Sequence, residues 1–322
     1  MKVDSLYRYP VKGLSPEKLS SVQVAVGNGF PLDRKYALLR TEAAFDAAAP
    51  VWLAKANFVM LMLHEQVAAL QTRYLEAGNQ LRIRTPAGHE HTFALNDGAQ
   101  RAALGQFFLD FMPKRLGTAP RLVEARGHQF TDKAEKYVSL INLASVRELE
   151  KRWGQTLDPL RFRANIYIDD AEPFAELDWV GREIWFGRVF AQVMQRNGRC
   201  AATNVNPRTG VRDRDVPGKL RADFGHKDLG IYLKITQSGM LVSGDPVEIE
   251  PVLKERKATT RATTPQHANQ LICTACYYLF DPGKLNEAWT APKDLPESYR
   301  CPDCGAGRDA CIPASAFKAP AP

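Results

Sequence analysis

Two Cys-x-x-Cys pairs near the C-terminal end constrain this chain most strongly. The first pair is Cys273 and Cys276, the second is Cys301 and Cys304, and 24 residues separate them. Each pair can bring two thiolates to one point, and four thiolates in a tetrahedron bind zinc or iron. A short module with such a centre is either a structural staple or an electron relay.

The residues around the two pairs favour the relay. Residues 277–282 read Tyr-Tyr-Leu-Phe-Asp-Pro, and residues 294–300 read Asp-Leu-Pro-Glu-Ser-Tyr-Arg before the second pair, which Gly305 follows. In these features residues 271–313 resemble rubredoxin, which implies one iron held by the four cysteines. The resemblance also implies an aromatic shield that helps to set the potential of the iron; its members would be Tyr277, Tyr278, Phe280, Trp289 and Tyr299. A zinc ribbon has similar spacing and is the alternative.

The composition excludes several broad classes. A chain of 322 residues favours two or three domains. The sequence contains no run of 18 apolar residues, so no membrane span is expected. The first ten residues lack the apolar stretch of a secretory signal, so none is expected. Since four of the six cysteines are in the pairs, leaving Cys200 and Cys311, we expect a reducing, cytoplasmic compartment.

Positive charge is concentrated outside the C-terminal module. Residues 271–322 hold five Lys/Arg against six Asp/Glu, so the net charge of +7 divides into −1 there and +8 on the first 270 residues. A near-neutral to acidic module argues against a nucleic-acid finger. The excess on the larger part indicates an anionic ligand.

Hydrophobic periodicity predicts a mainly β protein with a few helices, of the α+β class. Helical periods occur over residues 97–112, after an Asn-Asp cap signal, and over 144–153. Residues 252–270 have no apolar periodicity and predict a flexible linker. Short alternating or apolar runs predict strands at residues 22–26, 36–39, 81–84, 165–168, 183–186, 189–195, 231–235 and 244–249.

The densest chemical segment is residues 195–214, which hold five arginines, one acid (Asp213) and Cys200. Cationic surroundings stabilise a thiolate, the form that attacks electrophiles or binds a metal. A buried structural cysteine in a basic surface loop is the alternative.

The pattern Arg-Cys-x-x-Thr-x-Val-x-Pro-x-Thr-Gly over residues 199–210 resembles the signature of the MOSC family, the molybdenum-cofactor sulfurase C-terminal domains. Further stretches resemble other elements of this family, in order along roughly residues 3–250. They are residues 9–13, 32–36, 161–166 and 244–247.

The resemblance implies a pyranopterin cofactor whose molybdenum is ligated by Cys200. Basic family positions would hold its phosphate and pterin, because guanidinium forks bind phosphate bidentately while lysine acts as a point charge. The implied cofactor-binding residues are Lys12, Arg34, Arg163, Asn165, Arg199 and Thr203. Gly13 and Gly198 stand where mitochondrial members of this family carry Ser. Two hydroxyl contacts to the cofactor are therefore expected to be missing or replaced by backbone amides.

These resemblances predict the domain organisation. We expect an N-terminal MOSC-type β-barrel domain over residues 1–95 and a MOSC domain over 96–251. A linker over 252–270, a rubredoxin-like domain over 271–313 and a tail over 314–322 would follow.

Within the MOSC family, the chain also resembles the mitochondrial amidoxime-reducing component in architecture. This resemblance implies a reductase of small N-hydroxylated compounds such as hydroxylamines and amidoximes. An NAD(P)H-linked reductase would supply electrons through the fused rubredoxin, and neither nucleic acid nor a membrane is expected as a partner. A sulfur carrier with a Cys200 persulfide and a structural zinc tail is the rival, and a cofactor-binding protein without turnover is a third class. The six histidines form no metal-ligand pattern; His226 is a candidate general acid, and Cys311 is expected to be buried packing.

Overall fold

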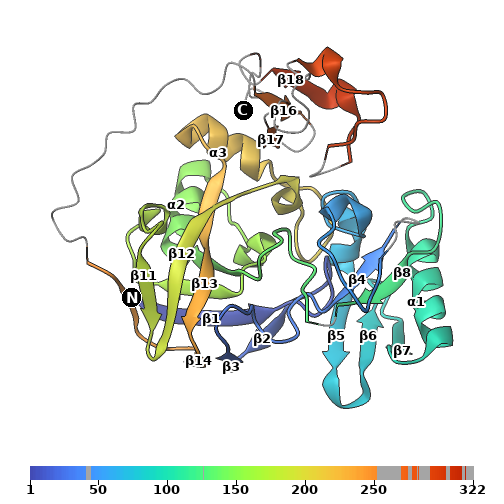
Figure 1. The fold of residues 1–322 in the computed structure, drawn as a ribbon, viewed down its shortest axis with the longest axis horizontal. Coiled ribbons are helices and arrows are strands. Elements are labelled where there is room, and N and C mark those ends of the chain that lie inside the picture. Colours follow the sequence, from blue (N-terminus) through green and yellow to red (C-terminus); the bar gives the residue numbers. More distant parts are fainter. Residues whose placement is uncertain are drawn as a thin grey trace.

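An eight-stranded sheet forms the centre of the fold (Figure 1). The computed structural model describes residues 1–40, 45–125, 127–251, 270–274, 278–280, 282, 291–301, 305–313 and 316. The strand order is β15-β11-β12-β13-β9-β10-β1-β2, and only β9 and β10 pair in parallel. The bounds are β1 Lys2–Arg8, β2 Glu17–Leu19, β9 Val138–Asn142, β10 Ile166–Asp169, β11 Glu183–Phe186, β12 Val189–Gly198, β13 Asp228–Gln237 and β15 Val247–Ile249.

Successive side chains of each strand point to opposite faces of this sheet, and each face packs against its own apolar core. Leu140 and Ile166 pack into one core, while their neighbours Ile141 and Tyr167 pack into the other. The second core also takes the apolar side chains of helices α2 (Leu143–Trp153) and α3 (Val216–Phe224). The first core is closed by the two-stranded sheet of β3 (Ser21–Val24) and β14 (Gly239–Val242).

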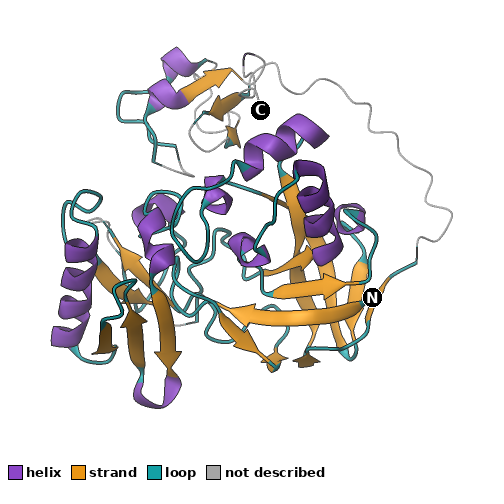
Figure 2. Ribbon diagram, turned by 180° about the vertical axis from the view of Figure 1, so that it is seen from behind, coloured by secondary structure: helices purple, strands orange, loops and turns teal. Residues whose placement is uncertain are grey.

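A smaller β part lies beside the large sheet and carries α1 on its outer side (Figure 2). Asp97 caps α1 (Gly98–Phe111), since its Oδ1 accepts from the Gln100 amide at 2.8 Å. Leu104 and Phe108 of α1 are buried in the core of this part. Its strands are β4 (Tyr36–Leu39), β5 (Gln71–Leu75), β6 (Gln80–Arg84), β7 (Glu90–Ala94) and β8 (Arg121–Glu124).

The C-terminal module lies against the body, on the side of α3 (Figure 1). Its sheet has the order β17-β16-β18, with β16 at Leu271–Cys273, β17 at Leu279–Phe280 and β18 at Cys311–Pro313. The predicted linker, apart from Gln270, and the predicted tail, apart from Ala316, lie outside the described residues. Short 3-10 helices complete the fold: η1 Lys55–Asn57, η2 Glu65–Ala69, η3 Glu76–Gly78, η4 Pro159–Phe162, η5 Ala175–Asp178, η6 Ala201–Asn204, η8 Pro292–Asp294 and η9 Arg308–Ala310.

The predicted α+β class is confirmed, and both predicted helices form within a residue or two of their expected ends. Helix α3 was not predicted. The strand predicted at 22–26 ends at Val24, and the strand predicted at 244–249 begins at Val247 because Gly244 has φ +97°. In the described ranges, none of the helices has the length and apolarity to cross a membrane.

Candidate functional site

One cavity of about 510 Å³ brings the predicted site residues of the body together. They come from segments far apart in the chain, and their roles as ligands stay predictions. Those in the lining are Lys12, Arg34, Arg163, Asn165, Arg199, Cys200 and Thr203. The lining also contains residues that the sequence did not single out, among them Trp52, Lys55, Asp132, Ser139 and Tyr232.

Cys200 is held where strand β12 ends and η6 begins. It is the N-cap residue of η6 and is partly exposed in the cavity. Its carbonyl accepts from the Thr203 amide at 3.0 Å and from Thr203 Oγ1 at 2.9 Å. These two bonds fix the backbone that presents the thiol. The Thr203 hydroxyl proton is therefore donated within the loop.

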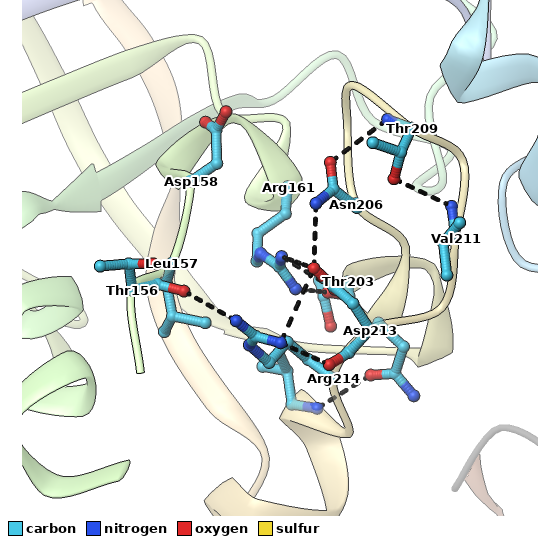
Figure 3. Close-up of polar contacts among 12 residues, drawn as sticks. Thr156, Leu157, Asp158, Arg161, Thr203, Asn206, Thr209, Val211, Asp213 and Arg214 are labelled. Atoms are coloured by element: carbon cyan, nitrogen blue, oxygen red, sulfur yellow. Dashed lines mark hydrogen bonds and ion pairs between the residues drawn. The ribbon is translucent and has the colours of Figure 1, made fainter. Parts of the chain in front are cut away.

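A polar network holds the loop after Cys200 (Figure 3). Arg161 donates to the Thr203 carbonyl at 3.0 Å and to Asp213 Oδ1 at 3.1 Å. Asn206 Nδ2 donates to Asp213 Oδ2 at 2.9 Å. Arg214 donates to the Asp213 carbonyl at 2.6 Å. Asp213, the one acid of the segment, thus forms an ion pair with Arg161 and ties the loop to η4.

Arg199 is buried beside Cys200. It donates through Nε to the Leu229 carbonyl at 2.7 Å and through Nη1 to the Phe162 carbonyl at 3.1 Å. Burial lowers the pKa of Arg199, and the nearby Cys200 thiol acts in the opposite direction. The partners of these guanidinium N–H groups are backbone carbonyls, which accept hydrogen bonds without neutralising the positive charge. These contacts therefore leave the positive charge of Arg199 in the lining of the cavity without an acidic partner.

Arg34 and Arg163 both stack on the Tyr9 ring, with guanidinium carbons 4.4 and 4.3 Å from its centre. Arg34 is neutralised by Asp33 at 2.5 Å. Burial lowers the pKa of Arg163 to about 10, and its buried Nη2 has no hydrogen-bond partner in the described part of the chain. A buried donor without a partner is costly, so an anionic group in the cavity fits this position.

Lys12 forms a second cationic point with Lys55. Lys12 Nζ lies 2.5 Å from Asp132 Oδ1 and 3.0 Å from the Phe130 carbonyl, and Lys55 Nζ lies 3.9 Å from Asp132 Oδ2. Burial alone would raise the pKa of Asp132, but the two lysines hold it well below its usual range. Burial lowers the pKa of Lys12. A phosphate oxygen is negatively charged like the Asp132 carboxylate, so it suits the same two lysines.

Asn165, just before β10, has structural partners on two other strands. Its Oδ1 accepts from the Ser139 amide and hydroxyl at 3.2 and 3.0 Å, and its Nδ2 donates to the Tyr7 carbonyl at 3.2 Å. These bonds join β1, β9 and β10 at the cavity wall. A contact of Asn165 with the cofactor stays a prediction.

Gly13 and Gly198, the two positions at which mitochondrial members of the family carry Ser, have different surroundings. Gly13 has φ +84°, and a Cβ there would lie 3.0 Å from the Val59 carbonyl, so a serine would be strained. At Gly198 a Cβ would meet Asp228 Oδ1 at 3.4 Å, an ordinary contact. His226, the candidate general acid, is absent from the described lining, and its Nδ1 accepts from the Asp228 amide at 3.1 Å.

In the C-terminal module, Cys273 and Cys301 are buried, whereas Cys276 and Cys304 lie outside the described residues. Within the described residues no group of three potential ligands could hold a metal ion. Cys311 lies opposite Cys273 across β16 and β18, and burial first, then Cys273 and Cys301, raises its pKa to about 12.

Three of the five predicted aromatics stack in this module. The ring centres are 5.7 Å apart both from Tyr278 to Phe280 and from Phe280 to Tyr299. Tyr277 and Trp289 lie outside the described residues.

Comparison with known proteins identifies two domains. Residues 1–112 match the profile of the MOSC N-terminal beta barrel domain, and residues 125–248 match that of the MOSC domain. Mitochondrial amidoxime-reducing component 1 of Danio rerio is 33% identical over 118 residues, which are 34% of this chain and 36% of that protein. Molybdenum cofactor sulfurase of Drosophila grimshawi is 36% identical over 118 residues, 34% of this chain and 15% of that protein.

Both relatives are therefore matched over little more than a third of their length or less. Among solved structures, the YUAD protein of Bacillus subtilis aligns with 77% of this chain and 94% of its own, with a TM-score of 0.36 and 13% identity. The two domain matches lie in the expected order and together enclose the cavity residues of the body. The chain is a MOSC-domain protein that carries both the MOSC N-terminal β-barrel domain and the MOSC domain.

Proposed function

We propose that this protein is a molybdenum-cofactor-dependent reductase of N-hydroxylated compounds, with Cys200 as the molybdenum ligand. The observation that carries the proposal is the cavity, in which a thiol and basic side chains from distant segments line one space of about 510 Å³. Such a volume accommodates one ligand of cofactor size. The similarity to an amidoxime-reducing component supports the same chemistry.

The residues present fit an anionic pterin. Arg163 offers a buried donor without a partner, and Lys12 and Lys55 converge on one carboxylate oxygen pair. We propose that these groups, with Arg34 and Arg199, hold the phosphate and pterin, and that Asn165 and Thr203 order the walls. Arg163 Nη2 would receive the charged group without giving up a partner, whereas Lys12 would exchange Asp132 for it.

The proposed reaction converts R–NHOH, two electrons and two protons into R–NH2 and water. The bound cofactor would supply the oxygen-accepting, two-electron chemistry. The chain itself would supply the thiolate, the cationic environment and the shielding from bulk water. Substrates would be small hydroxylamines and amidoximes.

We propose that electrons arrive through the C-terminal module, as a rubredoxin-like domain over 271–313 with one iron on Cys273, Cys276, Cys301 and Cys304. In support, Cys200 packs in the same apolar cluster as Cys273 and Cys301. An NAD(P)H-linked reductase would be the donor, and zinc is the alternative metal. The proposed location is the cytoplasm, and the proposed domain limits remain 1–95 and 96–251 for the body.

A sulfur carrier is the second candidate, favoured by the similarity to a molybdenum cofactor sulfurase. Cys200 would then carry a persulfide, and the tail would be a zinc staple. Mass spectrometry of the peptide that contains Cys200 distinguishes the two, because a persulfide adds the mass of one sulfur atom.

The test uses full-length protein from molybdenum-replete cells and a strong artificial donor such as reduced methyl viologen. We expect bound molybdenum and reduction of benzamidoxime, both lost in Cys200→Ser, because a hydroxyl is a harder ligand than a thiolate. Cys311→Ser is the matched control and should keep both. Full molybdenum content and turnover in Cys200→Ser would contradict the assignment.

A further inference from the structure

The C-terminal module packs directly against the wall of the Cys200 cavity. Met60, Met62 and Ala201 of the body share one buried apolar cluster with the module's apolar side chains. A Cβ built on Gly305 would lie only 3.6 Å from the Ala56 Cβ, which is van der Waals contact. The module members of the cluster include Leu271, Phe280, Leu295 and Tyr299.

Tyr278 carries this contact into the cavity. Of the module's described residues, Tyr278 is the one that lines the space containing Cys200. Its position is fixed because its carbonyl accepts from the Cys273 amide at 2.9 Å. Its ring is also stacked on Phe280 at an interplanar angle of 17°.

The wall around Cys200 combines two kinds of side chain. Lys12, Arg163 and Arg199 are basic, while Met60, Met62 and Tyr278 belong to the apolar cluster against which Cys200 packs. A cofactor held by the cations leaves the aromatic side for the group that approaches Cys200. Flat aromatic groups stack on such a ring with a gain of ~0.5–1.5 kcal/mol beyond buried area.

We propose that Tyr278, supplied by the docked C-terminal module, is a specificity-determining wall of the Cys200 pocket that favours flat, aromatic N-hydroxylated substrates. The proposal rests on the proposed function for its substrates, but the wall itself is a property of the chain. The docked module thus shapes the pocket in addition to bringing Cys273 and Cys301 near it.

The first experiment compares KM for benzamidoxime and acetamidoxime in the holoenzyme, with reduced methyl viologen as donor so that the module's electrons are not needed. Tyr278→Ala should raise KM for benzamidoxime about 2- to 12-fold and leave KM for acetamidoxime unchanged. Tyr278→Phe keeps the ring and should keep both values. Equal effects on the two substrates, or none, would overturn the proposal.

The second experiment needs no turnover. In full-length, cofactor-free protein, the alkylation rate of Cys200 is measured by peptide mapping with small N-ethylmaleimide and bulky pyrene maleimide. Tyr278→Ala and Ala56→Arg, which prevents close approach of Gly305, should both accelerate the bulky reagent selectively. Ala48→Arg makes the same change at an exposed position and should not.

The two experiments separate the two proposals. If the protein reduces neither substrate but the two variants show faster alkylation of Cys200 by the bulky maleimide, the proposed reductase function is refuted. The proposal that Tyr278 forms a wall of the pocket is then retained. A chain in which both variants alkylate as the unchanged protein does would refute the wall, whatever its activity.

Discussion

The guanidinium carbon of Arg163 lies 4.3 Å from the centre of the Tyr9 ring, on a backbone whose φ is +52°. This left-handed conformation costs an L-residue other than Gly about 1–2 kcal/mol. Burial also lowers the pKa of the guanidinium to about 10, so its charge is disfavoured in the fold. Such local costs concentrate at functional sites, and here the residue that bears them lines the cavity.

Arg163→Asn should therefore stabilise the cofactor-free protein and weaken cofactor retention. Asn tolerates the left-handed conformation, so we expect unfolding free energy to rise by about 1 kcal/mol. Thermal melts of the cofactor-free chain and the molybdenum content of the purified protein measure the two effects. Arg163→Lys keeps the charge but not the fork, and should retain an intermediate amount of molybdenum without the gain in stability. Unchanged molybdenum in Arg163→Asn would refute this role.

Gly230→Ala should damage both the fold and the cofactor site. Gly230 has φ +75°, and a Cβ would lie 2.2 Å from the Leu140 carbonyl and 3.1 Å from Arg199 Nη2. We expect a loss of about 1–2 kcal/mol from the backbone and about 1–3 kcal/mol from overpacking, with less molybdenum bound.

Gly225→Ala is the matched control, because φ is +73° and no atom lies within 4 Å of its Cβ. It should show the backbone loss alone and bind molybdenum normally. Urea unfolding and metal analysis of the pair give the comparison. Equal losses at the two positions would show that contact with Arg199 and Leu140 is unimportant.

His64 should make the protein sensitive to mild acid. It is 1% exposed, and its Nδ1 accepts from the Met60 amide at 3.3 Å. Burial, followed by Arg40, lowers its pKa from 6.5 to about 4. Between these values the unfolded chain binds more protons, so this stability is complete above pH 6.5 and is lost as pH falls toward 4.

The loss is at most about 3.5 kcal/mol, from about 1.4 kcal/mol per pKa unit. His64→Gln should flatten the dependence of unfolding free energy on pH between 6.5 and 4, measured by urea titration at several pH values. His89→Gln, at an exposed position, controls for the substitution itself. An unchanged slope in His64→Gln would assign the acid sensitivity to other groups.

Local signals were enough for some elements and not for others. Asp97 and the helical stripe of Leu104 and Phe108 predicted α1, because capping and periodicity are encoded within one turn or two. Helix α3 had three helix signals, an Asp215 cap, Pro217 in its first turn and a Gly225 end, but its 9 residues are too few to show a clear apolar stripe.

The residues that line the cavity also divide into those that the sequence marked and those that it did not. Cys200 and Arg199 are adjacent in a dense motif, so the sequence marked them directly. Lys55, Asp132 and Tyr278 have no local signature and meet only because distant segments pack together. Tertiary proximity of this kind is not written in any short window of sequence.

The C-terminal module should bind one iron. Cys273 and Cys301 are buried beside a stack of aromatic rings, which suits a shielded one-electron centre. Protein purified after growth in iron-replete medium should be red and should bleach with dithionite. One zinc per chain with no visible band would contradict the prediction and favour the staple.

Turnover driven by an NAD(P)H-linked reductase should require the C-terminal module, because a one-electron centre must recharge a two-electron site twice per cycle. Truncation after residue 251 removes Cys273 and Cys301, which belong to the apolar cluster against which Cys200 packs. The truncated body should still bind molybdenum and reduce benzamidoxime with reduced methyl viologen, which delivers electrons directly. It should lose NAD(P)H-driven turnover.

Zinc-loaded full-length protein is the matched control for that truncation, because zinc keeps a four-thiolate fold but carries no electron. It should retain the viologen-driven rate and lose the NAD(P)H-driven rate, although the docked module and the Tyr278 wall remain. Both rates are measured on the same preparation by amine formation. Undiminished NAD(P)H-driven turnover in the zinc form would make the module structural and would favour the sulfur-carrier alternative for Cys200.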